Sequence, residues 1–142
     1  MATNLRIRKG FGDSVRIYDH IDLRVKSLAE AQSFYEALLP ALGFTRDAGI
    51  HGWLQFEAIG VDGAVEFFGV TESPQHKANE CRIAFWAESN SAVDRLAEIV
   101  VKAGARNVEG PGYDEGPGYY AVFFEDPSGN RLEICHRAEE AR

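Results

Sequence analysis

The feature that most constrains this chain is an internal repeat, because a strand, a helix and three strands occur twice within 142 residues. In each half, an alternating apolar and polar strand precedes a helical stripe that ends at a glycine, and three strand patterns with glycine-containing turns follow. The two units span about residues 17–71 and 79–137. A duplicated βαβββ unit buries its helices on one face of a curved sheet, so the opposite face must be a cavity or an interface.

The first unit begins with an alternating strand at 18–25. This strand places Ile21, Leu23 and Val25 on one face and His20, Asp22 and Arg24 on the other. Ser27 and Glu30 form a capping-box pattern at the start of a helix. Gly43 is a stop signal, and Pro40 predicts that the regular helix ends slightly earlier. The three following strands are expected at 44–49, 51–60 and 63–70.

The second unit repeats this order after a polar connection. Its first strand is expected at 81–88, with Arg82, Ala84 and Trp86 on one face. Ser91 with Asp94 is a weaker capping pattern, and a helical stripe ends at Gly104. The closing strands are expected at 106–110, 118–124 and 131–137. One domain at 17–137 would then lie between an N-terminal lead at 1–16 and a tail at 138–142.

Composition limits the partners. A hydrophobic content of 45% suits one compact domain, and a net charge of −7 argues against nucleic-acid or anionic-membrane binding. No apolar run approaches the roughly 20 residues of a membrane span, and the first residues lack the apolar core of a secretory signal. Cys81 and Cys135 are interpreted as two reduced cysteines. We therefore expect a cytoplasmic protein whose partner is a small molecule.

Two glutamates interrupt otherwise apolar strands, Glu66 in VEFF and Glu133 in RLEIC. Both lie in the last strand of a unit, and the repeat likewise matches His20 with Arg82. A solvated sheet face is one interpretation of these polar residues. Their symmetric placement in the two units favours the other interpretation, in which they line a pocket.

These residues lie in stretches that resemble the vicinal oxygen chelate superfamily, which includes glyoxalase I, bleomycin-resistance proteins and extradiol dioxygenases. The resemblance covers residues 17–137 and is carried by DHIDLRV, AEAQSFYEALLPALGFT, CRIAFWAES and GYYAVFFEDPSGNRLEI. It implies an α+β fold of two βαβββ units forming a curved mixed sheet with a concave cavity, of the glyoxalase/bleomycin-resistance/dihydroxybiphenyl dioxygenase type. It also implies a homodimer, and exposed sheet edges give a physical reason to pair.

The resemblance further implies a divalent metal on the concave face, with ligands from the first and last strands of each unit. Those positions here are His20, Glu66, Arg82 and Glu133. Arg82 replaces the usual fourth ligand, and arginine has no lone pair to donate. The remaining imidazole and two carboxylates would suit Fe, Mn, Co, Ni or Zn. Two interpretations stay open: a three-residue metal site with Arg82 turned toward a bound anion, or a metal-free cluster in which Arg82 neutralises both glutamates.

Other side chains are candidates for the same pocket. Trp86 shares the face of Arg82 and would form an apolar wall. Tyr119 and Tyr120 must point in opposite directions, and we assign Tyr120 to the cavity. The Gly/Pro-rich segment Gly110–Gly118 is either a mobile lid or a plain surface loop.

Asp22 lies on the predicted face of His20. It would either replace the missing ligand or hold the His20 imidazole through a hydrogen bond. His51 and His76 fall in predicted loops or strand ends and are weaker substitutes.

Three functions follow from these residues. The first is an enzyme acting on a small oxygenated or carbonyl metabolite, a glyoxalase-like lyase or dioxygenase, whose metal polarises a substrate oxygen while Arg82 clamps an anionic group. The alternative is a metal-free binding protein that sequesters a small molecule, as the bleomycin-resistance relatives do. The third is a metal-free isomerase or lyase with His20 and Glu133 as acid and base. The sequence does not name the substrate, because one fold hosts many chemistries.

Overall fold

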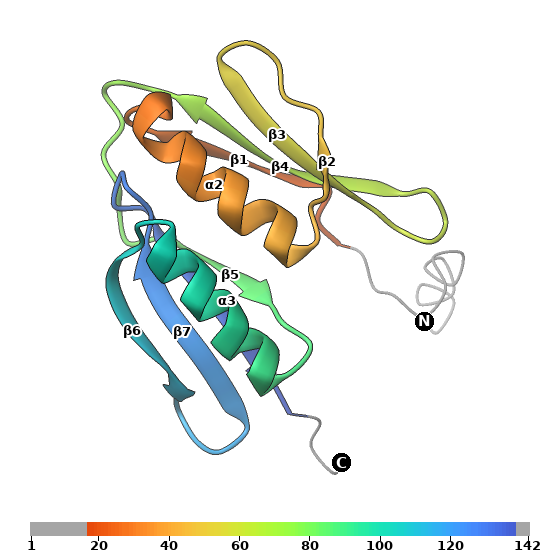
Figure 1. The fold of residues 1–142 in the computed structure, drawn as a ribbon, viewed down its shortest axis with the longest axis vertical. Coiled ribbons are helices and arrows are strands. Elements are labelled where there is room, and N and C mark those ends of the chain that lie inside the picture. The colour runs from red at the N-terminus through yellow and green to blue at the C-terminus, as the bar shows by residue number, and fades with distance from the viewer. Residues whose placement is uncertain (1–16, 139–142) are drawn as a thin grey trace, which may run out of the picture.

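The computed structural model describes residues 17–138, which form two four-stranded sheets and two helices (Figure 1). The first unit contains β1 (His20–Val25), α2 (Leu28–Leu42), β2 (Arg46–Asp47), β3 (Trp53–Ile59) and β4 (Val65–Glu72). The second contains β5 (Arg82–Trp86), α3 (Asn90–Lys102), β6 (Arg106–Tyr113), β7 (Tyr119–Glu125) and β8 (Arg131–Arg137). The predicted α+β fold of two βαβββ units is confirmed. The predicted lead at 1–16 and the tail residues 139–142 lie outside the described residues.

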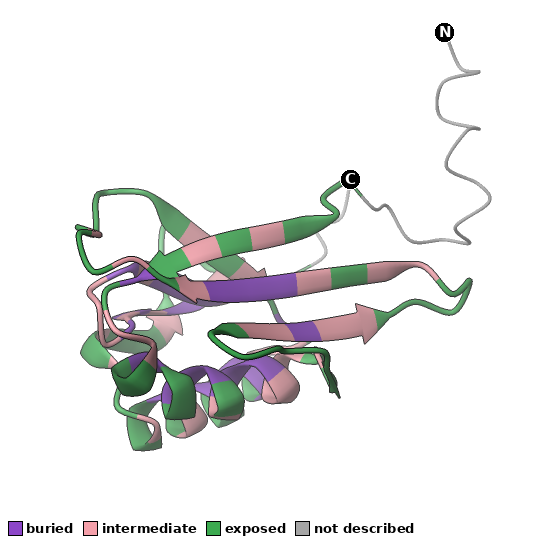
Figure 2. Ribbon diagram, turned by 90° about the horizontal axis from the view of Figure 1, so that it is seen from above, coloured by how far each residue is buried: buried purple, intermediate pink, exposed green. Residues whose placement is uncertain are grey.

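Both sheets have the same mixed topology. Their strand orders are β1-β4-β3-β2 and β5-β8-β7-β6, and the first strand of each unit runs parallel to the last. The two helices lie on one side of both sheets, and their buried residues face the strands (Figure 2). We call the sheet face opposite the helices the open face. Each unit therefore has one open face that no helix covers.

The helix ends follow local sequence signals, with two corrections. The Ser27 side chain accepts a hydrogen bond from the Glu30 backbone N–H, and Gly43 ends α2 with a φ of 117°, as predicted. Pro40 does not end the helix early, because burial of Leu38 and Leu39 holds this turn in place although the proline lacks one N–H donor. Helix α3 is capped by Ser89, which accepts from the Ala92 N–H at 3.0 Å, and not by Ser91.

The turn 126–130, between β7 and β8, holds the second unit against the first through hydrogen bonds. The Asp126 carboxylate is fully buried and accepts hydrogen bonds from the Ser128 and Asn130 backbone N–H groups. The Tyr35 hydroxyl, on α2 of the other unit, donates to the same carboxylate at 2.5 Å. Burial, and then Asp126, raise the pKa of Tyr35 well above its usual value. The Asn130 side-chain amide donates to the backbone carbonyl of Arg24, so one polar turn fixes the second unit against the first.

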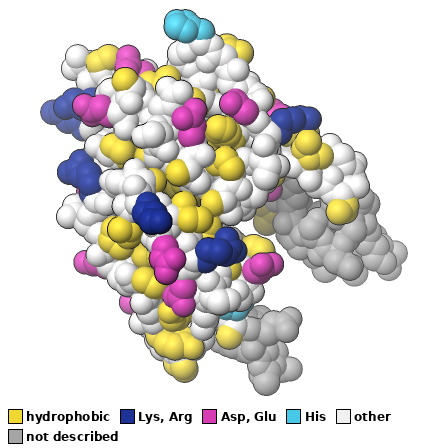
Figure 3. All heavy atoms as spheres, in the orientation of Figure 1, with side chains coloured by type: hydrophobic (Ala, Val, Ile, Leu, Met, Phe, Trp, Pro, Cys, Tyr) yellow, Lys and Arg dark blue, Asp and Glu magenta, His cyan; other side chains and the backbone are white. Residues whose placement is uncertain are grey.

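The helix side of the molecule shows acidic and basic side chains interspersed around apolar ones (Figure 3). Among the described residues, no helix is long and apolar enough to cross a membrane.

Candidate functional site

Two predicted site residues of the second unit, Arg82 and Glu133, lie on the open face of its sheet. Arg82, Ala84 and Trp86 alternate as exposed residues along β5, as predicted. The register of β5 with β8 places Ala84 beside Glu133. Since paired residues share a sheet face, Glu133 lies on the open face next to Arg82.

Glu133 is the most enclosed carboxylate of this face, with 5% of its surface exposed. The Tyr119 hydroxyl donates a hydrogen bond to Glu133 Oε2. Phe123 is the register partner of Glu133 on β7, and the Arg82 guanidinium carbon lies 5.0 Å from the centre of its ring. The Arg137 guanidinium carbon lies 4.3 Å from the centre of the Tyr119 ring. Glu133 thus sits among two aromatic rings and two cations.

The protonation of this cluster reflects a competition between burial and charge. Burial raises the pKa of Glu133 above its usual 4.5, whereas the Arg82 charge lowers it, and burial prevails. Burial and the Glu133 charge also raise the pKa of the Cys135 thiol. Glu133 is therefore suited to exchange a proton, while Cys135 is a poor nucleophile.

The open face of the first sheet is chemically different. The His20 ring stacks on Phe67, with ring centres 4.4 Å apart and planes 4° from parallel. His20 Nδ1 lies 2.7 Å from Asp19 Oδ2. Asp22 instead accepts a hydrogen bond from Arg24 at 2.6 Å, so the hypothesis that Asp22 holds the imidazole is wrong. Asp19 takes that role because it reaches Nδ1 from the residue just before His20.

Glu66 does not share a face with His20. The hairpins β3–β4 and β7–β8 pair Ile59 with Val65 and Glu125 with Arg131, across connections of equal length at 60–64 and 126–130. Counting from these pairs, the residue equivalent to Glu133 is Phe67, and Glu66 corresponds to the buried Leu132. A shift of one residue moves a side chain to the other face of a sheet. The sequence alignment of Glu66 with Glu133 was wrong by one residue.

These positions do not fit the predicted metal site. Across residues 17–138, no group of three or more His, Cys, Asp or Glu side chains converges as ligands would. Glu66 lies on the face opposite His20, and Glu133 lies on the other sheet, bound to Tyr119. A single copy of the chain therefore does not assemble His20, Glu66 and Glu133 around one ion.

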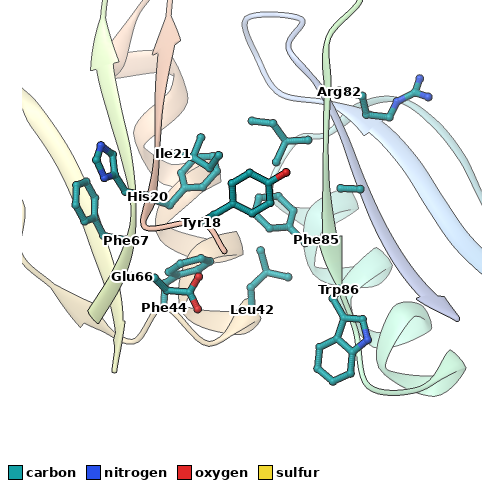
Figure 4. A pocket seen from close by; sticks show the side chains of 13 residues that line it. Tyr18, His20, Ile21, Leu42, Phe44, Glu66, Phe67, Arg82, Phe85 and Trp86 are labelled. Atoms are coloured by element: carbon teal, nitrogen blue, oxygen red, sulfur yellow. The ribbon is translucent and has the colours of Figure 1, made fainter. Parts of the chain in front are cut away.

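A cavity of about 560 Å³ lies between β1, β4 and β5. Its walls are mainly apolar: Ile21, Leu42, Phe44, Phe67, Phe68, Ile83, Ala84, Phe85 and Trp86. Tyr18, His20, Glu66 and Arg82 complete the lining. Figure 4 shows the His20 ring and the Arg82 guanidinium pointing away from its centre, with Glu66 near Phe44 and Trp86 at one end. Glu133 is not part of this lining, so the cavity and the Glu133 cluster are neighbours that share Arg82.

Two further interpretations need correction. Tyr120 faces the helix layer, where its hydroxyl donates to Asp94 at 2.6 Å, so Tyr119 and not Tyr120 reaches the open face. Successive residues of β7 point to opposite faces of the sheet, and the β7–β8 register decides which of the two tyrosines shares the face of Glu133. The start of the suggested lid, up to Tyr113, belongs to β6. Only 114–118 forms a connection outside strands.

The remaining histidines lie elsewhere. His76 Nε2 is 2.9 Å from Asn130 Oδ1 at the joint between the units, and His136 Nδ1 is 2.8 Å from the Ala87 carbonyl oxygen. His51 is exposed in the turn before β3. None of the three lines the cavity.

Comparison with known proteins agrees with the fold described above. The profile of the "Glyoxalase/Bleomycin resistance protein/Dioxygenase superfamily" matches residues 17–134. The chain is 29% identical over 121 residues to the uncharacterized protein YqjT of Bacillus subtilis. The matched region covers 81% of this chain and 94% of YqjT.

Solved structures show the same architecture. A glyoxalase/bleomycin resistance protein from Albidiferax ferrireducens superposes with a TM-score of 0.72 at 24% identity, over 86% of this chain and all of that one. The fosfomycin resistance protein FosX from Mesorhizobium loti superposes with a TM-score of 0.61 at 18% identity, over 88% and 95% of the two chains. At these identities the likeness establishes the fold alone.

Proposed function

The chain belongs to the Glyoxalase/Bleomycin resistance protein/Dioxygenase superfamily, and we propose that it is an enzyme that transfers a proton to or from a small carbonyl or other oxygenated metabolite. The observation that carries the proposal is the state of Glu133. This carboxylate is nearly enclosed, receives a hydrogen bond from Tyr119 and has a raised pKa. A carboxylate held in this way is a suitable general acid or base near neutral pH.

The neighbouring groups suit the rest of the reaction. In the proposed complex, Arg82 donates hydrogen bonds to a substrate oxygen and stabilises the negative charge that develops there when a proton leaves the adjacent carbon. Glu133 accepts that proton. Trp86 and the cavity wall receive the apolar part of the molecule and exclude water. No step is assigned to a metal, because among residues 17–138 no three His, Cys, Asp or Glu side chains converge as metal ligands would.

We propose that a second copy of the chain completes the site. Both open faces carry exposed aromatic or aliphatic side chains, among them Trp86 at 71% and Ile59 at 52% exposure. Strands β1 and β5 are edge strands, each paired on one side only. Facing the first sheet of one copy with the second sheet of another would cover these groups and set His20 opposite Glu133. Sedimentation equilibrium tests this arrangement, and a monomer throughout the accessible concentration range would refute it.

The cavity also supports a second candidate, a metal-free binding protein. A mainly apolar volume of about 560 Å³ is of the size that holds a drug-like molecule. In this case the ligand is bound and released unchanged. Both candidates use the cavity and the neighbouring Glu133 cluster, so binding alone does not distinguish them. Only the enzyme would convert the bound compound to a product.

Solvent exchange tests the proposal without knowledge of the physiological substrate. An enzyme that removes a proton next to a carbonyl group introduces deuterium at that carbon in D₂O. Proton NMR would follow a panel of 2-oxo acids, 1,2-dicarbonyls and hydroxyketones with the wild type and with Glu133→Gln. We expect accelerated exchange of at least one compound by the wild type and its loss in the variant, with both proteins equally folded by circular dichroism. Equal exchange rates for both proteins with every compound would refute the proposal.

A further inference from the structure

The open face of the second sheet also indicates the class of substrate. Resting on the proposed function, we propose that the substrate is a small organic acid whose anionic group is held by Arg82 and Arg137, on either side of Glu133. Arg137 is a new candidate, because neither its sequence position at the end of β8 nor the repeat singles it out.

The two arginines are held in similar ways. Each guanidinium lies over an aromatic ring of β7, Arg82 over Phe123 and Arg137 over Tyr119. The face of an aromatic ring attracts a cation electrostatically, so each ring helps to hold its guanidinium in place. This attraction does not require an N–H donor, so the guanidinium donors remain able to bind an oxyanion.

Among the residues that the structure describes, neither guanidinium has a carboxylate partner. Within residues 17–138, Arg82 and Arg137 form no ion pair, although Arg24 and Arg46 of the first unit each do. The nearest enclosed carboxylate is Glu133, whose hydrogen bond comes from Tyr119. Both arginine charges lower the pKa of Glu133, so both are close enough to act on it. Two unpaired cations beside the proton-transferring group are the arrangement that an anionic substrate requires.

Further charged residues lie on or near the same face. Arg131 is the register partner of Arg82 on one side and of Glu125 on the other. Glu125 accepts a hydrogen bond from the Asn107 side chain at 2.9 Å. Asp114 acts on Glu133 in the direction that raises its pKa. Glu109 also lies on this face, because it pairs with Phe123. What distinguishes Arg82 and Arg137 is therefore not an excess of positive charge but their position beside Glu133 without an ion pair among residues 17–138.

The geometry also restricts where the reacting atom lies. An anionic group held by both guanidiniums leaves the carbons that follow it to lie over Glu133, and the proton that Glu133 accepts comes from one of these carbons. A 2-oxo acid has its carbonyl group next to the carboxylate and exchangeable protons on the following carbon. This class therefore matches both the arginines and the proposed proton transfer.

The experiment compares phenylpyruvate with its primary amide, which has nearly the same shape and no charge. Calorimetry would measure the binding of both to the wild type, Arg82→Gln, Arg137→Gln and the control Arg95→Gln, which removes an exposed arginine from α3. Each variant loses hydrogen bonds to a charged group, so we expect the dissociation constant of phenylpyruvate to rise at least about tenfold in each of the first two variants. The control should bind like the wild type, and the amide should bind weakly to all four proteins.

The outcomes separate this inference from the proposed function. Equal binding of acid and amide, or unchanged binding in both Arg82→Gln and Arg137→Gln, would overturn the anion site. If neutral carbonyl compounds still exchanged deuterium through Glu133, the proposed function would stand without it. If phenylpyruvate bound through the two arginines but no compound exchanged, the anion site would stand and the proton-transfer function would fall.

Discussion

The two units place different chemistry at equivalent positions. Phe67 and Glu133 are each the third residue of the last strand, and they pair with His20 and Ala84 on the first strands. Arg82 begins β5 two residues before Ala84, on the same face. In the first unit His20 stacks on Phe67, whereas in the second Arg82 acts on the charge of Glu133. The repeat thus preserves the backbone frame but not the side chains that a ligand meets. One open face offers an aromatic stack, and the other offers a proton and two cations.

The turns that precede the last strands differ in the same way. Gly63 and Gly129 occupy equivalent positions with φ angles of 81° and 87°, so the backbone shape is shared. Asp62 accepts one hydrogen bond, from the Ala64 N–H, on an exposed turn. The buried Asp126 accepts four, one of them from Tyr35 in the other unit. Only the second turn supports the joint between units.

The largest effect should come from breaking this joint. Asp126→Ala leaves the Tyr35 hydroxyl and two backbone N–H groups without partners, and we expect a loss of at least about 3 kcal/mol in the free energy of unfolding. The matched change Asp62→Ala should cost about 1 kcal/mol or less. Urea unfolding of the three proteins measures both values.

A milder variant keeps this comparison informative if Asp126→Ala does not fold. Tyr35→Phe removes only the hydroxyl that bridges the units, and we expect it to cost about 1.5–3 kcal/mol. Similar costs for Asp62→Ala and either joint variant would show that the two turns contribute alike. The asymmetry between the units would then be limited to their open faces.

Much of this asymmetry could not be derived from the sequence. Alternation and caps such as Ser27 predicted the order of the elements, because these signals are local. The face of Glu66 could not be fixed in this way, since a glutamate between apolar residues looks the same one position earlier or later. Only the pairing of Ile59 with Val65 sets the register.

Long-range contacts were equally hidden. Tyr35 and Asp126 are 91 residues apart, and neither residue carries a local signal that predicts their hydrogen bond. The choice between Tyr119 and Tyr120 also depended on the hairpin register. The sequence therefore indicated Arg82, Glu133 and the pair Tyr119 and Tyr120, but it did not indicate Phe123 or Arg137 beside them.

A smaller effect should appear in the pH dependence of stability. The pKa of Glu133 is raised above 4.5 in the folded protein, so the folded state binds this proton more tightly than the unfolded chain. Its contribution to stability is complete below that value and is lost as the pH rises through the folded pKa. Relative to the wild type, Glu133→Gln should therefore gain stability as the pH rises above 4.5 and through the raised pKa of Glu133.

Glu66→Gln is the control for this measurement, because it removes the same charge from the first unit. Urea unfolding across the same pH range should show the gain in Glu133→Gln and not in the control. Parallel curves for Glu133→Gln and the wild type would mean that the Glu133 carboxyl is not perturbed by burial. Its assignment as the proton-transferring group would then lose its main support.

The smallest expected effect is the response to metal ions. Thermal melts of chelator-stripped protein with Mn, Fe(II), Co, Ni or Zn should show no shift, because Glu66 lies on the face opposite His20 and Glu133 lies on the other sheet near Arg82. A guanidinium about 4 Å from a divalent ion is repelled by several kcal/mol at an effective dielectric constant near 20. A metal at about 100 times its dissociation constant would add roughly 2.7 kcal/mol and raise the melting temperature by a few degrees. Such a rise, if lost in both His20→Ala and Glu133→Gln, would contradict this prediction and require the two open faces to meet around one ion. Because one copy of the chain does not bring those residues together, the stabilisation would then also depend on protein concentration. The different open faces of the two units would in that case be complementary halves of one site, each supplied by a different copy.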